Sequence, residues 1–220
     1  MKKVAIGLAV ALVALIAFVA TRPDSYHVER SQEIAAPAEV AFDHVDGYKA
    51  WPEWSPWEKQ DPTMEKKYEG PERGAGAIYS WKSAKVGEGK MTTLESEPGK
   101  HVGIELKFIA PFANTARADF AFEPAGADAT KVTWAMNGKN NFMGKFFSLF
   151  MDMDSMIGKD FEAGLGALKT VAEADAQKRA AERAAAEAAA AQAAAAQAAA
   201  PADAAKPGEG QTAKPGAATP

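Results

Sequence analysis

Apolar and polar residues alternate along the middle of the chain in three runs. Residues 102–108, 116–123 and 131–137 each carry an apolar side chain at every second position. This two-residue period is typical of antiparallel strands that bury one face and expose the other. Glycines and prolines interrupt the segment 64–137 at short intervals, and helical patterns do not alternate with these strands. The pattern predicts an antiparallel meander of about six strands.

One strand and one short helix are predicted before this meander. Residues 25–34 alternate in part, because Val28 and Ile34 share one parity. Pro37 suits the first turn of a helix, and residues 38–45 supply apolar side chains at helical spacing. The complete sheet is therefore expected to have about seven strands.

A long amphipathic helix is predicted after the meander. Over residues 142–172, apolar side chains recur at intervals of three and four. Gly158, Gly164 and Gly166 fall inside this helix, where each glycine costs about 1 kcal/mol against alanine. A helix that keeps these glycines is expected to lie close against a sheet or to leave room for a ligand.

The first segment, residues 1–23, is predicted to be a transmembrane anchor or a signal-like segment. Lys2 and Lys3 precede an apolar run over 4–20, which spans about 25 Å as a helix against a hydrocarbon core of ~30 Å. Cleavage at the end of the run would leave Phe18 at position −3, where a small residue is needed. An uncleaved anchor is therefore favoured, with the domain on the outer (periplasmic or extracellular) side of the cytoplasmic membrane. Cleavage would instead give a secreted protein.

The remaining chain divides into one domain and a biased tail. Residues 24–172 have the size of one globular domain. Residues 173–200 are rich in alanine, the best helix former, and are predicted to be helical. Residues 201–220 contain mostly proline, glycine, alanine and lysine, which predicts a disordered tail. The tail is either a passive extension or a contact region.

Composition excludes several classes of function. The net charge is −4 and no run of Lys and Arg occurs, which argues against a nucleic-acid surface. Cysteine is absent, which excludes disulfides, thiolate catalysis and cysteine metal sites. His27, His44 and His101 fall in different predicted elements, without metal-ligand spacing. Neither a metal nor another cofactor is predicted, and no catalytic residue can be assigned.

Three of the five tryptophans lie within seven residues, over 51–57. Two prolines in the same stretch exclude a long regular helix or strand. Several large aromatic rings on one short connection favour the wall or mouth of an apolar cavity. A plug at one end of the hydrophobic core is the alternative.

The order of several segments carries a resemblance to a known superfamily. These segments are 34–40, 51–57, 76–81, 86–91, 111–112, 130–134 and 151–165. Together they resemble the START-like (SRPBCC) superfamily, in its branch of polyketide cyclase/dehydrase and lipid-transport proteins. The resemblance implies an α+β helix-grip fold, in which a curved antiparallel sheet wraps on a long C-terminal helix. It also implies an apolar space between sheet and helix.

Apolar side chains of the predicted elements are candidates for lining that space. The alternative is that they belong to the hydrophobic core. The candidates are Trp54, Trp57, Tyr79, Trp81, Met91, Phe108, Phe120, Trp134, Met136, Met153, Ile157 and Phe161.

Four polar residues are candidates for the same space. Asp46 and Glu53 flank the tryptophan cluster, and a carboxylate among indole rings would have a raised pKa and could act as a general acid. A helix-ending aspartate and a solvated glutamate are the alternative. Arg30 and Gln32 share the parity of the buried positions of the first strand. Pointing inward, they would bind a polar headgroup or a carboxylate.

Three functions follow from these expectations. The leading hypothesis is a membrane-tethered domain that binds a hydrophobic small molecule or lipid between sheet and final helix. The second is a polyketide cyclase/dehydrase-like enzyme, which requires a buried ionisable group in the cavity. The third is an envelope structural or stress protein whose cavity is closed.

Overall fold

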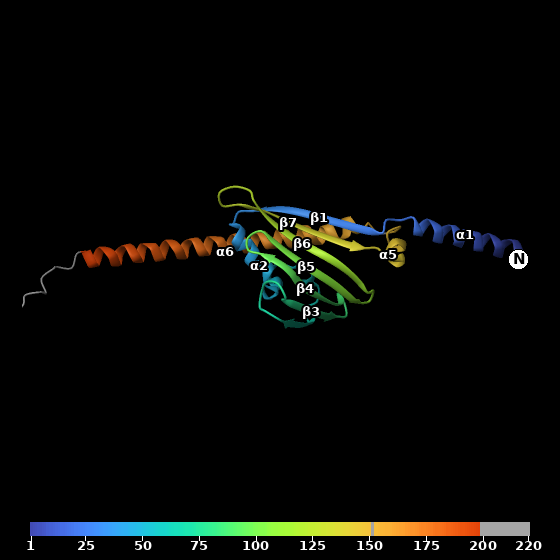
Figure 1. The fold of residues 1–220 in the computed structure, drawn as a ribbon, viewed down its shortest axis with the longest axis horizontal. Helices are drawn as coiled ribbons and strands as arrows, with labels where there is room; N and C mark the ends of the chain where they lie inside the picture. The colour runs from blue at the N-terminus through green and yellow to red at the C-terminus, as the bar shows by residue number, and fades with distance from the viewer. Residues whose placement is uncertain (151, 199–220) are drawn as a thin grey trace, which may run out of the picture. The chain divides into compact units, whose positions relative to one another are not determined.

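The computed structural model describes residues 1–150 and 152–198. Its centre is one seven-stranded antiparallel sheet with the order β1-β7-β6-β5-β4-β3-β2 (Figure 1). The strands are β1 (Ser25–Ile34), β2 (Glu65–Glu69), β3 (Ile78–Ser83), β4 (Gly87–Glu97), β5 (His101–Ala110), β6 (Asn114–Pro124) and β7 (Thr130–Lys139). The predicted seven-stranded sheet is confirmed.

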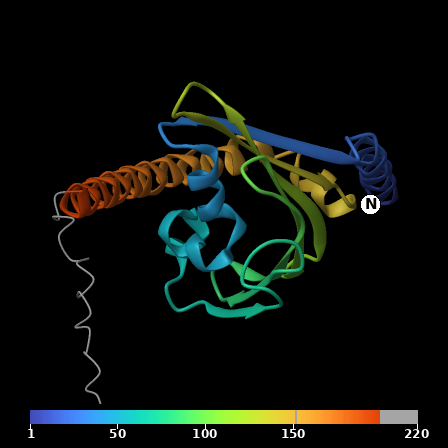
Figure 2. The ribbon, with the colours of Figure 1, turned by 60° about the vertical axis from the view of Figure 1, so that its left-hand side comes forward.

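The alternation seen in the sequence sorts the side chains of each strand between two faces. On β7, Val132, Trp134 and Met136 are buried, whereas the residues between them are half-buried. Strand β6 repeats the pattern and pairs Phe120 with Trp134. The sheet curves around the first part of helix α6 (Met153–Ala198), as Figure 2 shows. This arrangement is the expected α+β helix-grip fold.

Four short helical elements connect β1 to β2. They are α2 (Ala38–Asp46), the 3₁₀ turn η1 (Tyr48–Ala50), α3 (Trp51–Trp54) and α4 (Pro56–Gln60). Pro52 and Pro56 lie in the first turns of α3 and α4, where a missing N–H costs no helical hydrogen bond. The tryptophan cluster is therefore two short helices separated at Ser55.

The C-terminal helical region differs from the single helix predicted over 142–172. It contains α5 (Phe142–Phe147) and, after a break, α6. The Asp152 carboxylate accepts hydrogen bonds from the Asp154 amide (3.1 Å) and the Ser155 hydroxyl (2.6 Å). The first of these bonds, together with one from the Ser155 amide to the same carboxylate at 3.4 Å, satisfies backbone donors that are orphaned where a helix begins, so α6 starts anew at this point. The prediction of one continuous helix was wrong because the apolar period runs on across the break.

Helix α6 extends through the alanine-rich segment as far as Ala198. The chain divides into two compact units, Met1–Lys178 and Arg179–Pro220. In the second unit, residues 179–198 are helical and almost all of their described side chains are exposed. The predicted disordered tail, 201–220, lies outside the described residues.

Helix α1 (Lys2–Ala20) precedes the sheet. Among the described residues it is the one helix long and apolar enough to cross a membrane, and a signal sequence would meet the same criteria. Its side chains are exposed except for Val19, and its end is in contact with α5. Residues 21–24 alone separate it from β1.

Candidate functional site

A cavity of about 370 Å³ lies between the sheet, helices α3 and α4, and the first turns of α6. This volume is within the usual range of small-molecule sites. Its wall is formed by Trp51, Ser55, Trp57, Glu58, Gln60, Met64, Tyr79, Trp81, Lys85, Val86, Met91, Leu106, Phe108, Ala118, Trp134, Met136, Met156, Ile157, Asp160 and Phe161. The lining is mostly apolar.

Nine of the twelve apolar candidates line this cavity. They are Trp57, Tyr79, Trp81, Met91, Phe108, Trp134, Met136, Ile157 and Phe161. Trp54 and Phe120 belong instead to the solid core, because both are fully buried with their rings 6.0 Å apart. The Trp54 indole N–H donates to the His44 carbonyl at 2.9 Å, which holds the ring against α2. The side chain of Met153 lies outside the described part of the structure.

A stack of aromatic rings joins the sheet to α6 at the cavity wall. The ring of Trp134 lies parallel to that of Phe161, with centroids 4.1 Å apart and planes 6° apart. Trp57 meets both rings edge-on, at centroid distances of 5.5 Å to Trp134 and 6.3 Å to Phe161. The tryptophan cluster therefore contacts the C-terminal helix through Trp57.

Two helix glycines permit this close packing. A Cβ on Gly164 would lie 2.9 Å from Cζ3 of Trp134 and 3.1 Å from Cδ of Pro56. A Cβ on Gly158 would overlap with the guanidinium of Arg30. Gly166, in contrast, has open space around the same position. The expectation that a close approach explains the glycines is confirmed at Gly158 and Gly164.

The cavity contains one buried carboxylate, that of Glu58 on α4. Its side chain is only 4% exposed, and it accepts a hydrogen bond of 2.5 Å from the Tyr79 hydroxyl. The same carboxylate forms an ion pair with Lys66 of β2. Burial and the bond to Glu58 raise the pKa of the Tyr79 phenol far above its ordinary value, so Tyr79 remains a donor at neutral pH.

Asp61 fixes the end of α4, and thereby the direction of Glu58. One oxygen of the Asp61 carboxylate accepts from the amide (3.0 Å) and hydroxyl (2.7 Å) of Thr63. The other accepts from the hydroxyl of Ser83, the last residue of β3, at 2.6 Å. The bonds from Ser83 and Thr63 lower the pKa of Asp61, so its carboxyl group stays ionised and keeps accepting these bonds at neutral pH.

Asp46 and Glu53, proposed as cavity carboxylates, do not line the cavity. Asp46 is buried at the end of α2, where it accepts a hydrogen bond of 2.7 Å from the Ser96 hydroxyl. Glu53 lies on the outer side of α3 with its side chain 60% exposed, 4.0 Å from His44. The alternative of a helix-ending aspartate and a solvated glutamate therefore describes both residues.

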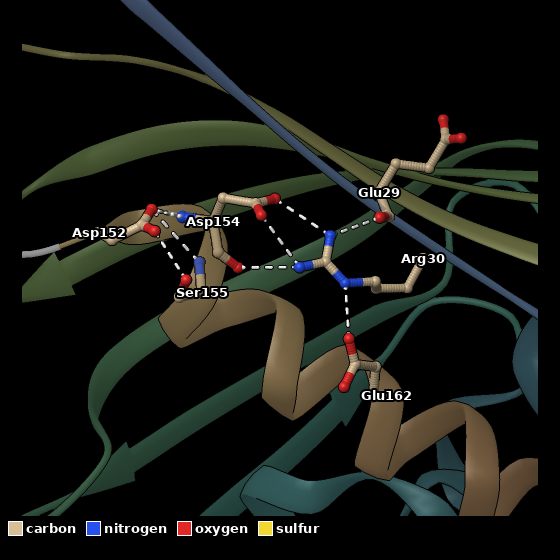
Figure 3. Close-up of polar contacts among 6 residues, drawn as sticks. All are labelled: Glu29, Arg30, Asp152, Asp154, Ser155 and Glu162. Atoms are coloured by element: carbon tan, nitrogen blue, oxygen red, sulfur yellow. Dashed lines mark hydrogen bonds and ion pairs between the residues drawn. The ribbon is translucent and has the colours of Figure 1, made fainter.

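Arg30 points toward α6 as its parity predicts, but it does not line the cavity either. Its guanidinium donates to Glu162 (2.8 Å) and to both carboxylate oxygens of Asp154 (3.0 and 3.1 Å), as Figure 3 shows. Gln32 also lies outside the cavity lining, and its amide donates to the Glu33 carbonyl at 3.0 Å. The first strand therefore holds the C-terminal helix through Arg30.

Eleven lining residues were absent from the list of cavity candidates, and Glu58 matters most among them. The others are Trp51, Ser55, Gln60, Met64, Lys85, Val86, Leu106, Ala118, Met156 and Asp160. Glu58 directly follows Trp57, and that adjacency to an aromatic candidate was the one available signal. Which way a five-residue helix turns its carboxylate depends on the contact between Asp61 and Ser83, which the sequence does not reveal.

The histidines do not form a metal site in the described part of the chain. No group of three or more His, Asp or Glu residues among the described residues could hold a metal ion. His27 contacts Asn137, His44 contacts Asp175 and His101 contacts Asp119, at 2.8, 3.2 and 3.1 Å. Each histidine thus has a separate polar partner.

Comparison with known proteins agrees with this geometry. The family model described as "Polyketide cyclase / dehydrase and lipid transport" matches residues 25–173. The chain belongs to this family. Family membership covers the whole sheet and the part of α6 that closes the cavity. No curated protein matches the chain.

Solved structures of other proteins share the fold of this chain. A Thermobifida fusca protein solved in solution has 20% identity and a TM-score of 0.51, covering 66% of this chain and 92% of its own. The Zhui aromatase/cyclase from Streptomyces sp. R1128 has 16% identity and a TM-score of 0.50, covering 68% and 94%. At these identities the likeness shows the fold alone.

Proposed function

We propose that the domain binds a hydrophobic small molecule or lipid in the cavity between the sheet and α6, while α1 tethers it to the cytoplasmic membrane with the domain on the outer side. The observation that carries this proposal is the cavity of about 370 Å³ with its mostly apolar lining. Burial of a ligand there would contribute ~25 cal/mol per Å² of apolar surface, before the costs of association.

Polar groups in the wall favour a ligand with an oxygen acceptor. The buried indole N–H groups of Trp81 and Trp134 have no hydrogen-bond partner among the described residues. A buried donor without an acceptor costs roughly 1–3 kcal/mol. A carbonyl, ester or carboxylate oxygen on the ligand would offset this cost at Trp81 after a small shift of its ring.

Native mass spectrometry of the full chain, released from detergent, tests the proposal with added cis-parinaric acid. Ala118 lines the cavity on β6, and Ala121 lies on the same strand at the opposite parity. We expect a one-to-one adduct in the wild type and in Ala121→Leu, and at least a tenfold weaker adduct in Ala118→Leu, because the larger side chain takes up part of the cavity. Absence of a wild-type adduct, or equal adducts in both variants, would contradict the proposal.

An enzymatic function is the second candidate, and the pair of Glu58 and Tyr79 favours it. A buried carboxylate and a phenol donor in one apolar cavity are suited to moving a proton at a carbon next to a carbonyl group. Exchange of the acetophenone methyl protons with deuterium, followed by NMR, tests this candidate. We expect exchange to be lost in Glu58→Gln and kept in the exposed control Glu53→Gln. A wild-type exchange rate equal to that of buffer alone would contradict the enzymatic function.

The third alternative, an envelope protein with a closed cavity, has less support. Its premise is a filled interior, whereas about 370 Å³ stays open beside α6.

A further inference from the structure

Exposed large apolar side chains gather at one end of the sheet. After residue 20, eight such side chains are exposed in the described structure, and two of them, Tyr68 and Leu94, lie elsewhere on the sheet. The other six, here called the apolar rim, are Ile109, Phe112, Phe142, Met143, Phe150 and Met156. Clustering of this kind marks an interaction surface rather than ordinary scattered exposure.

Strand register brings the apolar rim together. Ser25 at the start of β1 pairs with Lys139 at the end of β7, and α5 follows directly. At the same end, Phe108 of β5 pairs with Asn114 of β6. Neighbouring strands lie about 4.8 Å apart, so the ends of β5 and β7 are within roughly 10 Å of each other. The β5–β6 turn and α5 therefore occupy one end of the domain.

The end of α1 is held at this same place. Residues 21–24 can span at most about 14 Å between α1 and β1. Lys145 of α5 donates to the Ala20 carbonyl at 3.2 Å and forms an ion pair with Asp24. Asn140 donates to the Pro23 carbonyl at 3.2 Å. Figure 1 shows α5 beside the end of α1. A membrane that contains α1 must therefore lie close to the apolar rim.

The mouth of the cavity opens at this end too. The three exposed residues of its lining are Gln60, Lys85 and Met156. Gln60 precedes Asp61, which is bonded to the end of β3, and Lys85 lies in the β3–β4 turn. Met156 is itself part of the rim. The start of β4 lies against the β5–β6 turn, because a Cβ on Gly87 would lie 3.2 Å from Cδ of Pro111, the residue before Phe112 of the rim.

We infer that the apolar rim docks into the surface of the bilayer that holds α1, so that the cavity mouth faces the lipids and amphiphilic ligands pass directly between bilayer and cavity. This inference rests on the proposed function for its ligand. A lipid bilayer is the occupant because α1 brings it within reach, and because aromatic and aliphatic side chains at a helix end partition into the membrane interface.

The absence of cysteine from the sequence permits a direct test. Full-length Phe112→Cys, Phe150→Cys and Leu94→Cys variants are spin-labelled and reconstituted in vesicles of phosphatidylcholine and phosphatidylglycerol. Leu94 is the matched control, because its side chain is 47% exposed but lies on β4 away from the rim. Electron paramagnetic resonance then compares the access of oxygen, which enters lipid, with that of a nickel chelate, which stays in water.

We expect the ratio of oxygen access to nickel access at positions 112 and 150 to exceed that at 94 by at least fivefold. Equal ratios at the three positions would overturn docking, and so would dipolar broadening that reveals a second copy of the chain on the rim. The cis-parinaric acid adduct, measured on the same labelled variants, separates the two proposals. If the adduct forms while all spin labels are in water, the ligand-binding proposal stands and the docking proposal is wrong. If the wild type forms no adduct, the ligand-binding proposal itself is wrong.

Discussion

The guanidinium of Arg30 occupies the space that a side chain at position 158 would need. A Cβ on Gly158 would overlap with Nη2 of Arg30, and the same guanidinium is bonded to Asp154 and Glu162 on either side of that glycine. The missing side chain at Gly158 leaves room on the surface of α6 for the Arg30 guanidinium, which links β1 to the helix. Ile157, next to this glycine, and Phe161, one helical turn further on, line the cavity. The contact therefore fixes the part of α6 that covers the cavity.

The first prediction is that Gly158→Ala and Arg30→Ala are coupled. Alanine in a helix interior should stabilise by about 1 kcal/mol relative to glycine. At position 158 this gain should be reduced or reversed, because the new methyl group displaces the guanidinium from Asp154. In an Arg30→Ala background the gain should return. Urea unfolding of the four proteins in this double-mutant cycle measures the coupling, and strict additivity would contradict the contact.

Gly164→Ala and Gly166→Ala should change stability in opposite directions. A methyl group at 164 meets Trp134 and Pro56, two rigid and packed side chains, and we expect a loss of about 1–3 kcal/mol. At 166 the same change meets open space and should add up to about 1 kcal/mol. Thermal unfolding monitored by circular dichroism compares the pair. A stabilised Gly164→Ala variant would mean that the helix lies farther from the sheet than described here.

The architecture was predictable because each strand keeps its two-residue period on a sheet with one buried face. The break before α6 was not, since the apolar period continues across it and only the hydrogen bonds of Asp152 mark the new start. For the site, the alternation along β1 correctly predicted that Arg30 lies on the face toward α6. Its guanidinium does not reach the cavity, because it binds Asp154 and Glu162 of α6 instead. Glu58 escaped prediction because a tertiary contact, that of Asp61 with Ser83, orients its helix.

Loss of the Asp154 carboxylate should matter at neutral pH and not in acid. The hydrogen bond from Arg30 lowers the pKa of Asp154 below its ordinary value of about 3.9. A depressed native pKa means that the contribution to stability is complete above the unfolded pKa and disappears as the pH falls through the native one. Asp154→Asn should therefore destabilise the protein from pH 7 to about 5, with the difference shrinking as the pH falls below about 4.

Chemical unfolding of the wild type and of Asp154→Asn across this pH range measures the effect. In an Arg30→Gln background the pH dependence of the substitution should flatten, because the charged partner is gone. A difference that persists unchanged at low pH would assign the effect to the Asp154 backbone region rather than to the carboxylate.

The last prediction concerns the ion pair between Lys66 and Glu58 at the cavity wall. Lys66→Met should destabilise by about 1–3 kcal/mol, because it leaves a buried carboxylate with only the Tyr79 hydroxyl as partner. Adding Glu58→Leu should recover much of this loss, since an apolar pair removes the uncompensated charge. Lys67→Met is the matched control on the same strand: its pair with Glu69 is 71% and 46% exposed and should contribute no more than about 0.5 kcal/mol. Equal effects at positions 66 and 67 in urea unfolding would show that Glu58 is solvated, and that the cavity lacks the buried carboxylate on which an acid–base function depends.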